Sequence, residues 1–252
     1  MKKILLGTAA LIAMGAVAPA LAADMPARAY TKAPPMMAAM YDWSGFYLGI
    51  NGGGGSAHTC SSLTAVPLGA VVPALPQGCN NATGGTVGGQ IGYRWQASNW
   101  VFGLEGQGNW ADFSGSNVNQ QFLALSDRTK VNAFGLITGQ VGYAWNNVLA
   151  YVKGGAAVTS NKYTTFTTAT GGIVDSASET RWGAAVGAGL ELGFAQNWTV
   201  GVEYDHLFMG NHNVSANTPA GAFSATSRIS QDVDIGLVRL NYRFGGPVIA
   251  KY

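Results

Sequence analysis

The chain has 252 residues, which suits one large all-β domain or two smaller domains. Charged residues make up 10% of it, against about 25% in soluble globular domains, and 36 residues are glycine. So few charges are poorly suited to covering a large water-exposed surface. The composition therefore argues against an ordinary soluble domain.

Residues 1–22 are predicted to be a secretory signal peptide. Lys2 and Lys3 form a positive head, residues 4–17 form a short apolar run, and Ala20-Leu21-Ala22 is a small-residue cleavage site. Cleavage after Ala22 removes two lysines and lowers the Lys+Arg count from 14 to 12, which equals the 12 Asp+Glu residues. The near-neutral mature chain gives no electrostatic support for a nucleic-acid partner.

Residues 23–42 are rich in Pro, Ala and Met, and this composition predicts an extended lead-in rather than a strand. Residues 43–244 are predicted to form the folded domain, and residues 245–252 a short C-terminal tail. After the signal peptide, no run of residues reaches the ~18 apolar residues that a transmembrane helix needs.

One hairpin pattern occurs three times, at residues 89–107, 139–156 and 189–205. The first glycines of the three copies stand 50 residues apart by number, and each copy reads as strand, short Asn-bearing turn, strand. With their flanking segments they predict eight strands that alternate short turns with long loops, as in outer-membrane barrels. The predicted strands cover residues 43–54, 83–95, 100–113, 130–145, 148–162, 179–194, 198–209 and 228–244.

Side-chain alternation assigns two faces to the predicted sheet. In residues 198–209, Trp198, Val200 and Val202 alternate with smaller or polar residues, and a period of two places the sets on opposite sides. The charged residues fall on the small, polar face. They are Arg94, Glu105, Lys153, Arg181, Glu191, Glu203, Asp205, Arg239 and Arg243. In a membrane barrel this face lines the lumen and the apolar face meets lipid.

Aromatic residues favour the membrane barrel over a soluble, lipocalin-like carrier. Most of them flank the short turns, as an interfacial girdle requires. Trp100 and Trp110 lie ten residues apart on one face, and about ten residues tilted by about 40° span about 25 Å of membrane. The predicted interfacial set is Tyr93, Trp95, Trp100, Trp110, Tyr143, Trp145, Trp182, Phe194, Trp198, Phe208, Tyr242 and Phe244. The predicted fold is thus all-β, an eight-stranded antiparallel up-and-down transmembrane β-barrel.

Several motifs carry a resemblance that covers essentially the whole mature chain. They are an MKK signal ending in ALAAD, the opening YDWSGFYLGINGGGG, the segment GGQIGYRW and the closing VRLNYRF. With these the chain resembles the small outer-membrane barrels of alphaproteobacteria, the porin-like, immunogenic major outer-membrane proteins of rhizobial and related bacteria. The resemblance implies export through the periplasm, a Gram-negative outer-membrane location, and contact with the barrel-assembly machinery, lipid and lipopolysaccharide. Either Phe244 or Tyr252 would supply the aromatic assembly signal.

Cys60 and Cys79 lie in the predicted long loop 55–82 of an exported protein, and we expect them to form a disulfide. Between them lies an apolar stretch, residues 65–76. Such a stretch on a loop would either contact a surface or host partner or lipopolysaccharide, or fold back on the barrel mouth.

The interior of an eight-stranded barrel is just wide enough for side chains to fill. We therefore expect the interior charges to pair with one another, and weak or no conductance. The inward glycines Gly183, Gly187, Gly189 and Gly193 leave room for water and leakage of small solutes. The main hypothesis is an integral barrel that contributes to envelope structure and surface contact, and a narrow porin is the alternative.

Catalysis has little support in the sequence. His58, His206 and His212 are the three histidines, and no GxSxG motif or metal-ligand spacing accompanies them. His206 follows Asp205, but adjacent strand residues point to opposite faces and make a poor dyad. We predict no enzyme activity, no metal and no cofactor. The resemblance also implies a further alternative, because some members of that family are associated with haem binding: the loop histidines His58 or His212 would then serve as an axial ligand.

Overall fold

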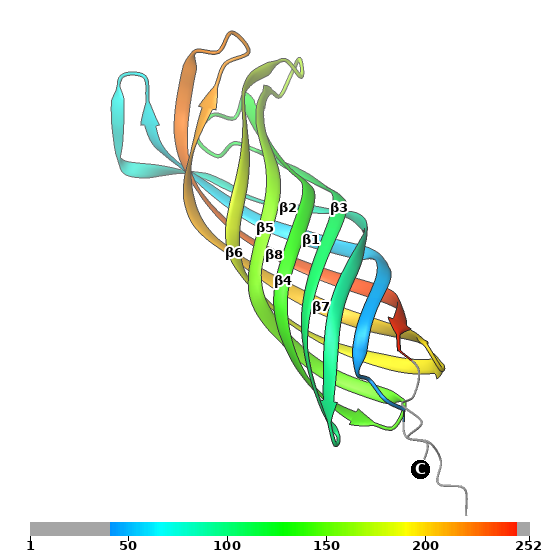
Figure 1. Ribbon diagram of the computed structural model, residues 1–252. Helices are drawn as coiled ribbons and strands as arrows, with labels where there is room; N and C mark the ends of the chain where they lie inside the picture. The colour runs from blue at the N-terminus through cyan, green and yellow to red at the C-terminus, as the bar shows by residue number, and fades with distance from the viewer. Residues whose placement is uncertain (1–40, 246–252) are drawn as a thin grey trace, which may run out of the picture. The chain divides into compact units, whose positions relative to one another are not determined.

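The computed structural model describes residues 41–245, which fold into a closed β-barrel (Figure 1). The predicted signal peptide, residues 23–40 and residues 246–252 lie outside the described part. The strands are β1 (Gly45–Val66), β2 (Gly69–Ala97), β3 (Trp100–Val118), β4 (Leu125–Trp145), β5 (Val148–Thr167), β6 (Ile173–Ala195), β7 (Trp198–Asn217) and β8 (Phe223–Phe244).

Each strand pairs antiparallel with the next along the chain, and β1 pairs with β8 to close the barrel. The closing register runs from Phe46 opposite Phe244 to Ala65 opposite Thr226. The predicted fold class is confirmed. Among residues 41–245, no helix is long and apolar enough to cross a membrane.

The strands are longer than predicted at the end opposite the short turns. Residues 55–82, predicted to be a loop, continue β1 and β2 in paired register to Val66 opposite Gly69. The three other predicted loops likewise shrink to residues 119–124, 168–172 and 218–222. These extensions are rich in Gly, Ser, Thr and Asn and lack the alternation of a half-buried strand, so the pattern did not predict them. Cross-strand pairing with at least one neighbouring strand holds them in the sheet, as in the β1–β2 and β4–β5 pairs.

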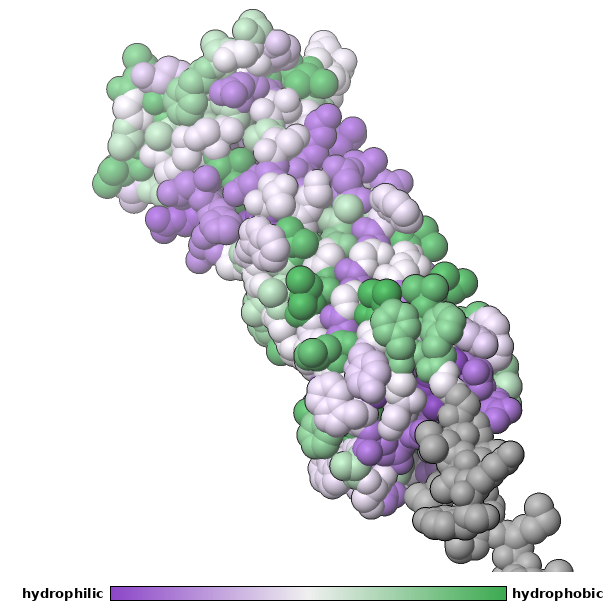
Figure 2. Space-filling model, in the orientation of Figure 1, coloured by the Kyte–Doolittle hydropathy of each residue, from purple (hydrophilic) through white to green (hydrophobic). Residues whose placement is uncertain are grey.

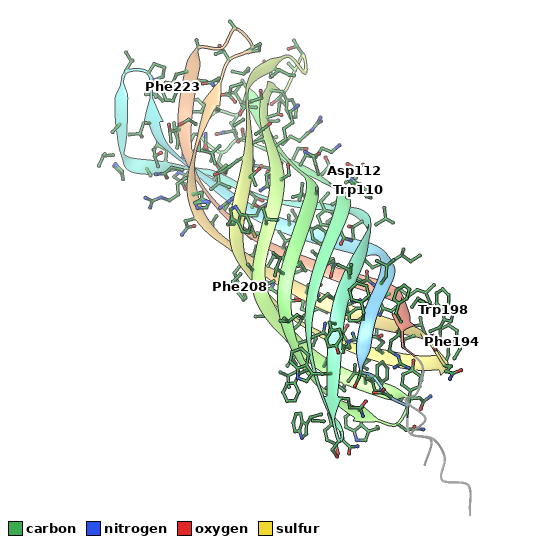
Figure 3. All side chains as sticks on the ribbon, viewed as in Figure 1. Trp110, Asp112, Phe194, Trp198, Phe208 and Phe223 are labelled. Atoms are coloured by element: carbon green, nitrogen blue, oxygen red, sulfur yellow. A yellow bond between two sulfur atoms is a disulfide. The ribbon has the colours of Figure 1, made fainter. Side chains whose placement is uncertain are left out.

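The outer surface carries aromatic residues at two levels. Near the short turns, Phe194 and Trp198 point away from the barrel, and Trp110 and Phe208 do so further along the strands (Figure 3). Between these levels the outward residues are apolar, including Leu104, Ile137 and Val202. A barrel that spans a bilayer carries these surfaces in the same order: interfacial aromatics, an apolar band and a second level of interfacial aromatics. We call the level of Trp110 and Phe208 the outer belt.

Beyond the outer belt the surface becomes polar. Hydrophilic residues gather in a band below the hairpin tips (Figure 2). Four exposed or half-exposed charged residues lie beyond the outer belt on β3, β4 and β5, and we call them the polar collar: Asp112, Arg128, Lys130 and Lys162. Lys130 binds Asp112 at 2.9 Å, and Lys162 is its cross-strand neighbour. Because long loops face outward in such barrels and short turns face the periplasm, the collar and the strand extensions lie on the extracellular side.

Candidate functional site

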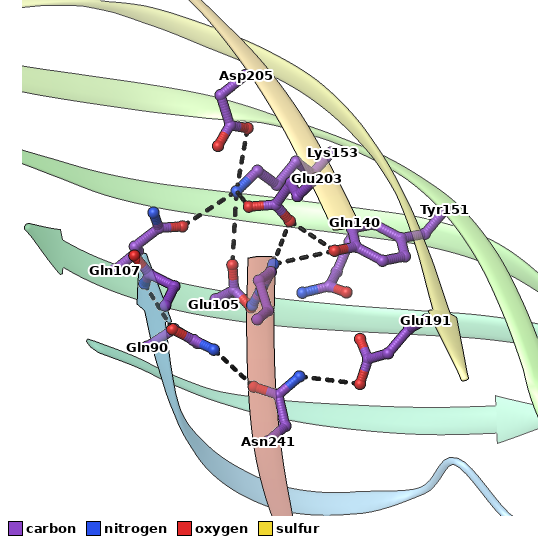
Figure 4. A network of polar contacts seen from close by, with 12 residues as sticks. Gln90, Glu105, Gln107, Gln140, Tyr151, Lys153, Glu191, Glu203, Asp205 and Asn241 are labelled. Carbon is purple, nitrogen blue, oxygen red and sulfur yellow. Dashed lines mark hydrogen bonds and ion pairs between the residues drawn. The ribbon is translucent and has the colours of Figure 1, made fainter. Parts of the chain in front are cut away.

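The lumen is filled by an ion-pair network that joins strands from all sides of the barrel (Figure 4). At its periplasmic end, Arg94 on β2 binds Glu191 on β6 through both terminal guanidinium nitrogens, at 2.8 and 3.1 Å. Asn241 donates to the same carboxylate at 2.9 Å, and Thr199 donates to it as well. Both charged groups are buried, so the pairing and the added donors compensate for their loss of water.

A second cluster surrounds Lys153 on β5. Its ammonium lies 2.7 Å from Glu203, 3.1 Å from Asp205 and 3.6 Å from Glu105. Arg239 on β8 bridges Glu105 and Glu203 from the other side. All of these side chains are buried. The sequence placed these residues on one face, and the structure brings seven of the nine predicted interior charges into these two groups.

Two tyrosines that the sequence reasoning missed complete the network. The hydroxyl groups of Tyr47 and Tyr151 donate to Glu105 and Glu203, each at 2.6 Å. Their rings lie against Gly92 and Gly189, where a Cβ would come within 2.5 Å of the ring. Tyr47 is the cross-strand partner of Gly92, and Tyr151 is that of Gly189. The feature that could have identified these tyrosines is an inward tyrosine on one strand opposite an inward glycine on the neighbouring strand.

The four inward glycines do not leave empty space beside them, contrary to the expectation from the sequence. The space beside Gly189 is filled by the Tyr151 ring, and that beside Gly193 by the Tyr41 ring. Gly187 accommodates Asp205 and Lys153, and Gly183 accommodates Met209. Glycine occurs at these positions because large neighbouring side chains cross over it, so the lumen is packed rather than open.

An apolar layer, also unpredicted, closes the lumen on the extracellular side of the network. Leu207 follows Asp205 by two residues along β7, and Leu237 precedes Arg239 by two along β8, so both point inward above the charges. The layer consists of Ala57, Ala82, Phe113, Val131, Phe134, Leu136, Ala157, Ala185, Leu207, Met209, Val233, Ile235 and Leu237. Water and ions moving along the barrel axis would have to cross this dry layer as well as the ion pairs.

Arg181 and Arg243 do not join the network, although they were predicted to pair inside it. Arg181 is fully buried beyond the apolar layer and donates to the carbonyl oxygens of Gly210 and Ile229, at 2.8 and 3.0 Å. Arg243 lies at the periplasmic mouth and donates to the carbonyls of Ser44 and Gln196. Backbone carbonyls, which a residue pattern does not reveal, bind both guanidinium groups, and Arg243 also lies 3.9 Å from the Asp42 carboxylate.

The predicted interfacial aromatics all lie on the outer face, exposed or half-exposed, in the two groups described above. Those near the short turns contact one another: Trp100 meets Tyr143 edge-on at 5.5 Å and Trp198 meets Tyr242 at 5.1 Å between ring centroids. Trp182 faces outward on β6. It lies near the level of Phe208, because the cross-strand partner of Phe208 is Ala184, two residues further along β6.

His58 and His212 were predicted to be loop residues, but both lie within strand extensions, in β1 and β7. Cys60 and Cys79 are cross-strand partners and form a disulfide on the outer face, with a Cα–Cα distance of 4.0 Å. His58 lies beside them and its Nδ1 contacts Asn81 at 2.6 Å. His206 faces outward and pairs with Asp234 on β8 at 2.7 Å, whereas Asp205 points into the lumen.

The apolar stretch at residues 65–76 does not fold back on the barrel mouth. Leu68 forms the tip of the β1–β2 hairpin and is fully exposed, and Val72 is also exposed. The three other hairpin tips also present apolar side chains to solvent, including Leu123, Ile173 and Phe223. We call these four places the apolar tips.

This chain is similar to known outer-membrane proteins. The 31 kDa outer-membrane immunogenic protein of Brucella melitensis is 32% identical over 234 residues, covering 85% of this chain and 90% of that protein. The 22 kDa outer membrane protein of Rhizobium leguminosarum is 29% identical over 164 residues, or 64% of this chain and 62% of that protein. Among solved structures, OprG of Pseudomonas aeruginosa aligns with a TM-score of 0.49 at 15% identity, over 81% of this chain and 97% of its own.

The family model described as outer membrane protein beta-barrel domain matches residues 8–244. This span includes every strand of the closed barrel, and the relatives confirm the resemblance to alphaproteobacterial outer-membrane proteins. The chain belongs to the outer-membrane β-barrel family and is an outer-membrane protein.

Proposed function

We propose that this protein is a non-conducting barrel that stabilises the outer membrane and holds an extracellular extension at the cell surface for contact with other surfaces. The packed lumen carries the proposal. Its ion pairs and apolar layer use side chains from all eight strands. Interior residues that pair mainly with one another are what a rigid anchor needs and what a pore lacks.

The strand extensions support the contact role. They continue beyond the outer belt, and the Cys60–Cys79 disulfide ties the longest of them together. Contiguous or clustered apolar groups on a soluble surface mark interaction sites. The apolar tips stand outside the polar collar, so they are placed to meet a second surface rather than the lipid of the protein's own membrane.

Contact with lipopolysaccharide is part of the same proposal. Lys130 and Lys162 are cross-strand neighbours on the outer face, and Arg128 follows on the extracellular side. Lysine and arginine bind phosphate groups through charge-assisted hydrogen bonds. We expect a triple glutamine variant of these residues to co-purify with less lipopolysaccharide than the wild type, while Arg228→Gln, on another side of the barrel, retains it.

Adhesion of intact cells to hexadecane droplets tests the contact role. Replacing Leu68, Leu123 and Phe223 with serine should lower the adhering fraction of cells at equal surface expression. The matched control replaces the lipid-facing residues Leu104, Ile137 and Val202 with alanine, which leaves the tips unchanged. Equal adhesion of wild type and tip variant would contradict the role of the tips. Impermeant maleimide should label a cysteine at position 68 on intact cells and should not label one at position 137.

A further inference from the structure

A cavity that the proposed function does not use lies inside the extracellular extension. Inward residues of all eight strands line it, directly above the apolar layer: Thr59 follows Ala57 by two residues, and Asn80 precedes Ala82 by two. It contains roughly 630 Å³ of space, counting the part open to solvent at its mouth. We call this cavity the cup.

Hydroxyl and amide groups dominate the lining. The Gln77 amide oxygen accepts hydrogen bonds from Ser61 and Ser227, at 2.8 and 2.9 Å. The Asn80 amide nitrogen donates to Asn117 at 3.0 Å and to Thr129 at 3.3 Å. These bonds join strands across the cup and fix the orientation of the lining groups. A wall of oriented donors and acceptors is suited to a ligand with several hydroxyl groups, because each side chain can both donate to and accept from a hydroxyl.

Two lining groups have hydrogen-bonding capacity that the described protein does not use. The Thr59 hydroxyl is buried, with only 3% of the residue exposed, and has no partner among residues 41–245. The Asn80 amide oxygen is likewise buried without a partner in that part of the chain. Buried polar groups are normally satisfied, so unsatisfied ones in a cavity wall indicate where a ligand atom would bind.

The cup also carries negative charge. Asp127 on β4 and Asp175 on β6 flank β5, and Thr165 is the cross-strand partner of both. Asn119 and Thr165 donate to Asp127 at 2.8 and 3.1 Å, and Ser224 donates to Asp175 at 2.8 Å. Within residues 41–245, neither carboxylate takes part in a salt bridge.

Cationic side chains near the cup are otherwise engaged. Arg128 contributes to the lining, but its guanidinium lies 5.0 Å from the centre of the Phe166 ring and packs over it. Arg181 lies below and is held by backbone carbonyls. A positively charged ligand would supply the basic partner that these two carboxylates lack.

We propose that the cup binds a small polyhydroxylated amine of the amino-sugar class. Asp127 and Asp175 receive the ammonium group, and the hydroxyl groups bind Thr59, Asn80 and the neighbouring amides. The apolar layer closes the floor of the cup, so the ligand is held at the cell surface and does not pass through the barrel. This site is independent of the apolar tips, because its residues point into the extension rather than away from it.

Titration calorimetry on the full chain in lipid nanodiscs tests the proposal, with D-glucosamine as the probe. D-Glucose lacks the ammonium group and N-acetyl-D-glucosamine has it masked, so each should bind at least tenfold more weakly. Asp127→Asn and Asp175→Asn should each weaken glucosamine binding at least tenfold, and Thr59→Val should weaken binding of all three sugars. The matched control is Asp112→Asn in the polar collar, which should bind as the wild type does.

Heat-resistant migration of each variant in electrophoresis establishes that its barrel is folded. Loss of binding in Asp127→Asn with that migration intact would support the site. Equal affinity for glucosamine and glucose would overturn the assignment of the carboxylates, and so would unchanged affinity in both Asp variants. Absence of glucosamine binding to the wild type would overturn the proposal as a whole. Saturation of the carboxylates by Ca²⁺ that glucosamine does not displace would show a cation site instead, and would overturn it too.

Discussion

Among single residues, Lys153 shows most directly what the interior charges do. Its ammonium lies among three buried carboxylates, those of Glu105, Glu203 and Asp205. Removing one partner from a buried ion pair leaves uncompensated charge and costs about 3–5 kcal/mol. We therefore expect Lys153→Met to lower the free energy of unfolding by about that amount, as measured by urea unfolding in lipid vesicles.

Lys130→Met is the matched control, because Lys130 forms a single exposed pair with Asp112. Exposed pairs contribute about 1 kcal/mol or less, so this variant should unfold almost as the wild type does. Similar losses in the two variants would show that the interior network contributes no more than a surface ion pair.

The carboxyl group of Asp127 should make the stability of the protein depend on pH. Burial in the cup raises the pKa of its carboxyl above the ordinary value of 3.8, and Asp175 raises the pKa further, while hydrogen bonds from Thr165 and Asn119 oppose both effects. The folded protein thus holds this proton more tightly than the unfolded chain. The stability that it contributes is present at low pH and is lost as pH rises through the raised pKa.

Carboxyl ¹³C NMR of the full chain in micelles measures this pKa directly. Asp175→Asn should lower the pKa of Asp127, and Asp112→Asn should leave it unchanged. A wild-type Asp127 that titrates at or below 3.8 would contradict the assignment of burial as the dominant cause.

At the scale of the elements, the β1–β2 extension depends on the Cys60–Cys79 disulfide, which joins residues 19 positions apart. Closing a loop of this length stabilises by about 3 kcal/mol in the chain-entropy model. A Cys60→Ser, Cys79→Ser variant should exchange amide hydrogens faster across residues 59–80, as hydrogen-exchange mass spectrometry would report. Protection of the membrane-spanning part of β1 should persist. A loss of protection around the whole barrel would mean that the extension and barrel unfold together.

Substitutions in and next to strand β4 test where the membrane boundary lies along the barrel. Ile137 faces outward between the aromatic levels and is exposed. Arginine on the lipid face near the bilayer midplane costs about 2–4 kcal/mol, so Ile137→Arg should lower the free energy of unfolding in vesicles by that amount. Leu123→Arg, at the tip before β4, should have almost no effect. Equal effects at the two positions would contradict the assignment of the outer belt as the membrane boundary.

The strands inside the membrane were predictable because lipid imposes alternation on them. A period of two predicts that Trp198, Val200 and Val202 face outward and that Glu203 faces inward. The same alternation predicts the interior charges. The extensions beyond the outer belt were not predictable, because water meets their outer face and a polar cup meets their inner one. Thr59 and Asn80 therefore lie in two strands, β1 and β2, where the pattern indicated a loop.

The contents of the lumen were predicted only in part. The charge pairs followed from the need to compensate buried charge, but the Tyr47–Gly92 and Tyr151–Gly189 pairs required the register between strands. The apolar layer required knowing that inward residues such as Phe113 and Leu207 lie at one level. Sequence assigns each residue to a face, whereas the level along the barrel axis depends on the stagger of all eight strands.

At the scale of the whole molecule, the central claim is that the lumen is sealed. Recording current across planar bilayers that contain the purified full chain tests this most directly, and quenching of the outer tryptophans by brominated lipid verifies insertion. We predict verified insertion with no discrete channels. Reproducible single-channel steps of uniform size from the inserted wild-type protein would contradict the sealed lumen and the non-conducting function built on it.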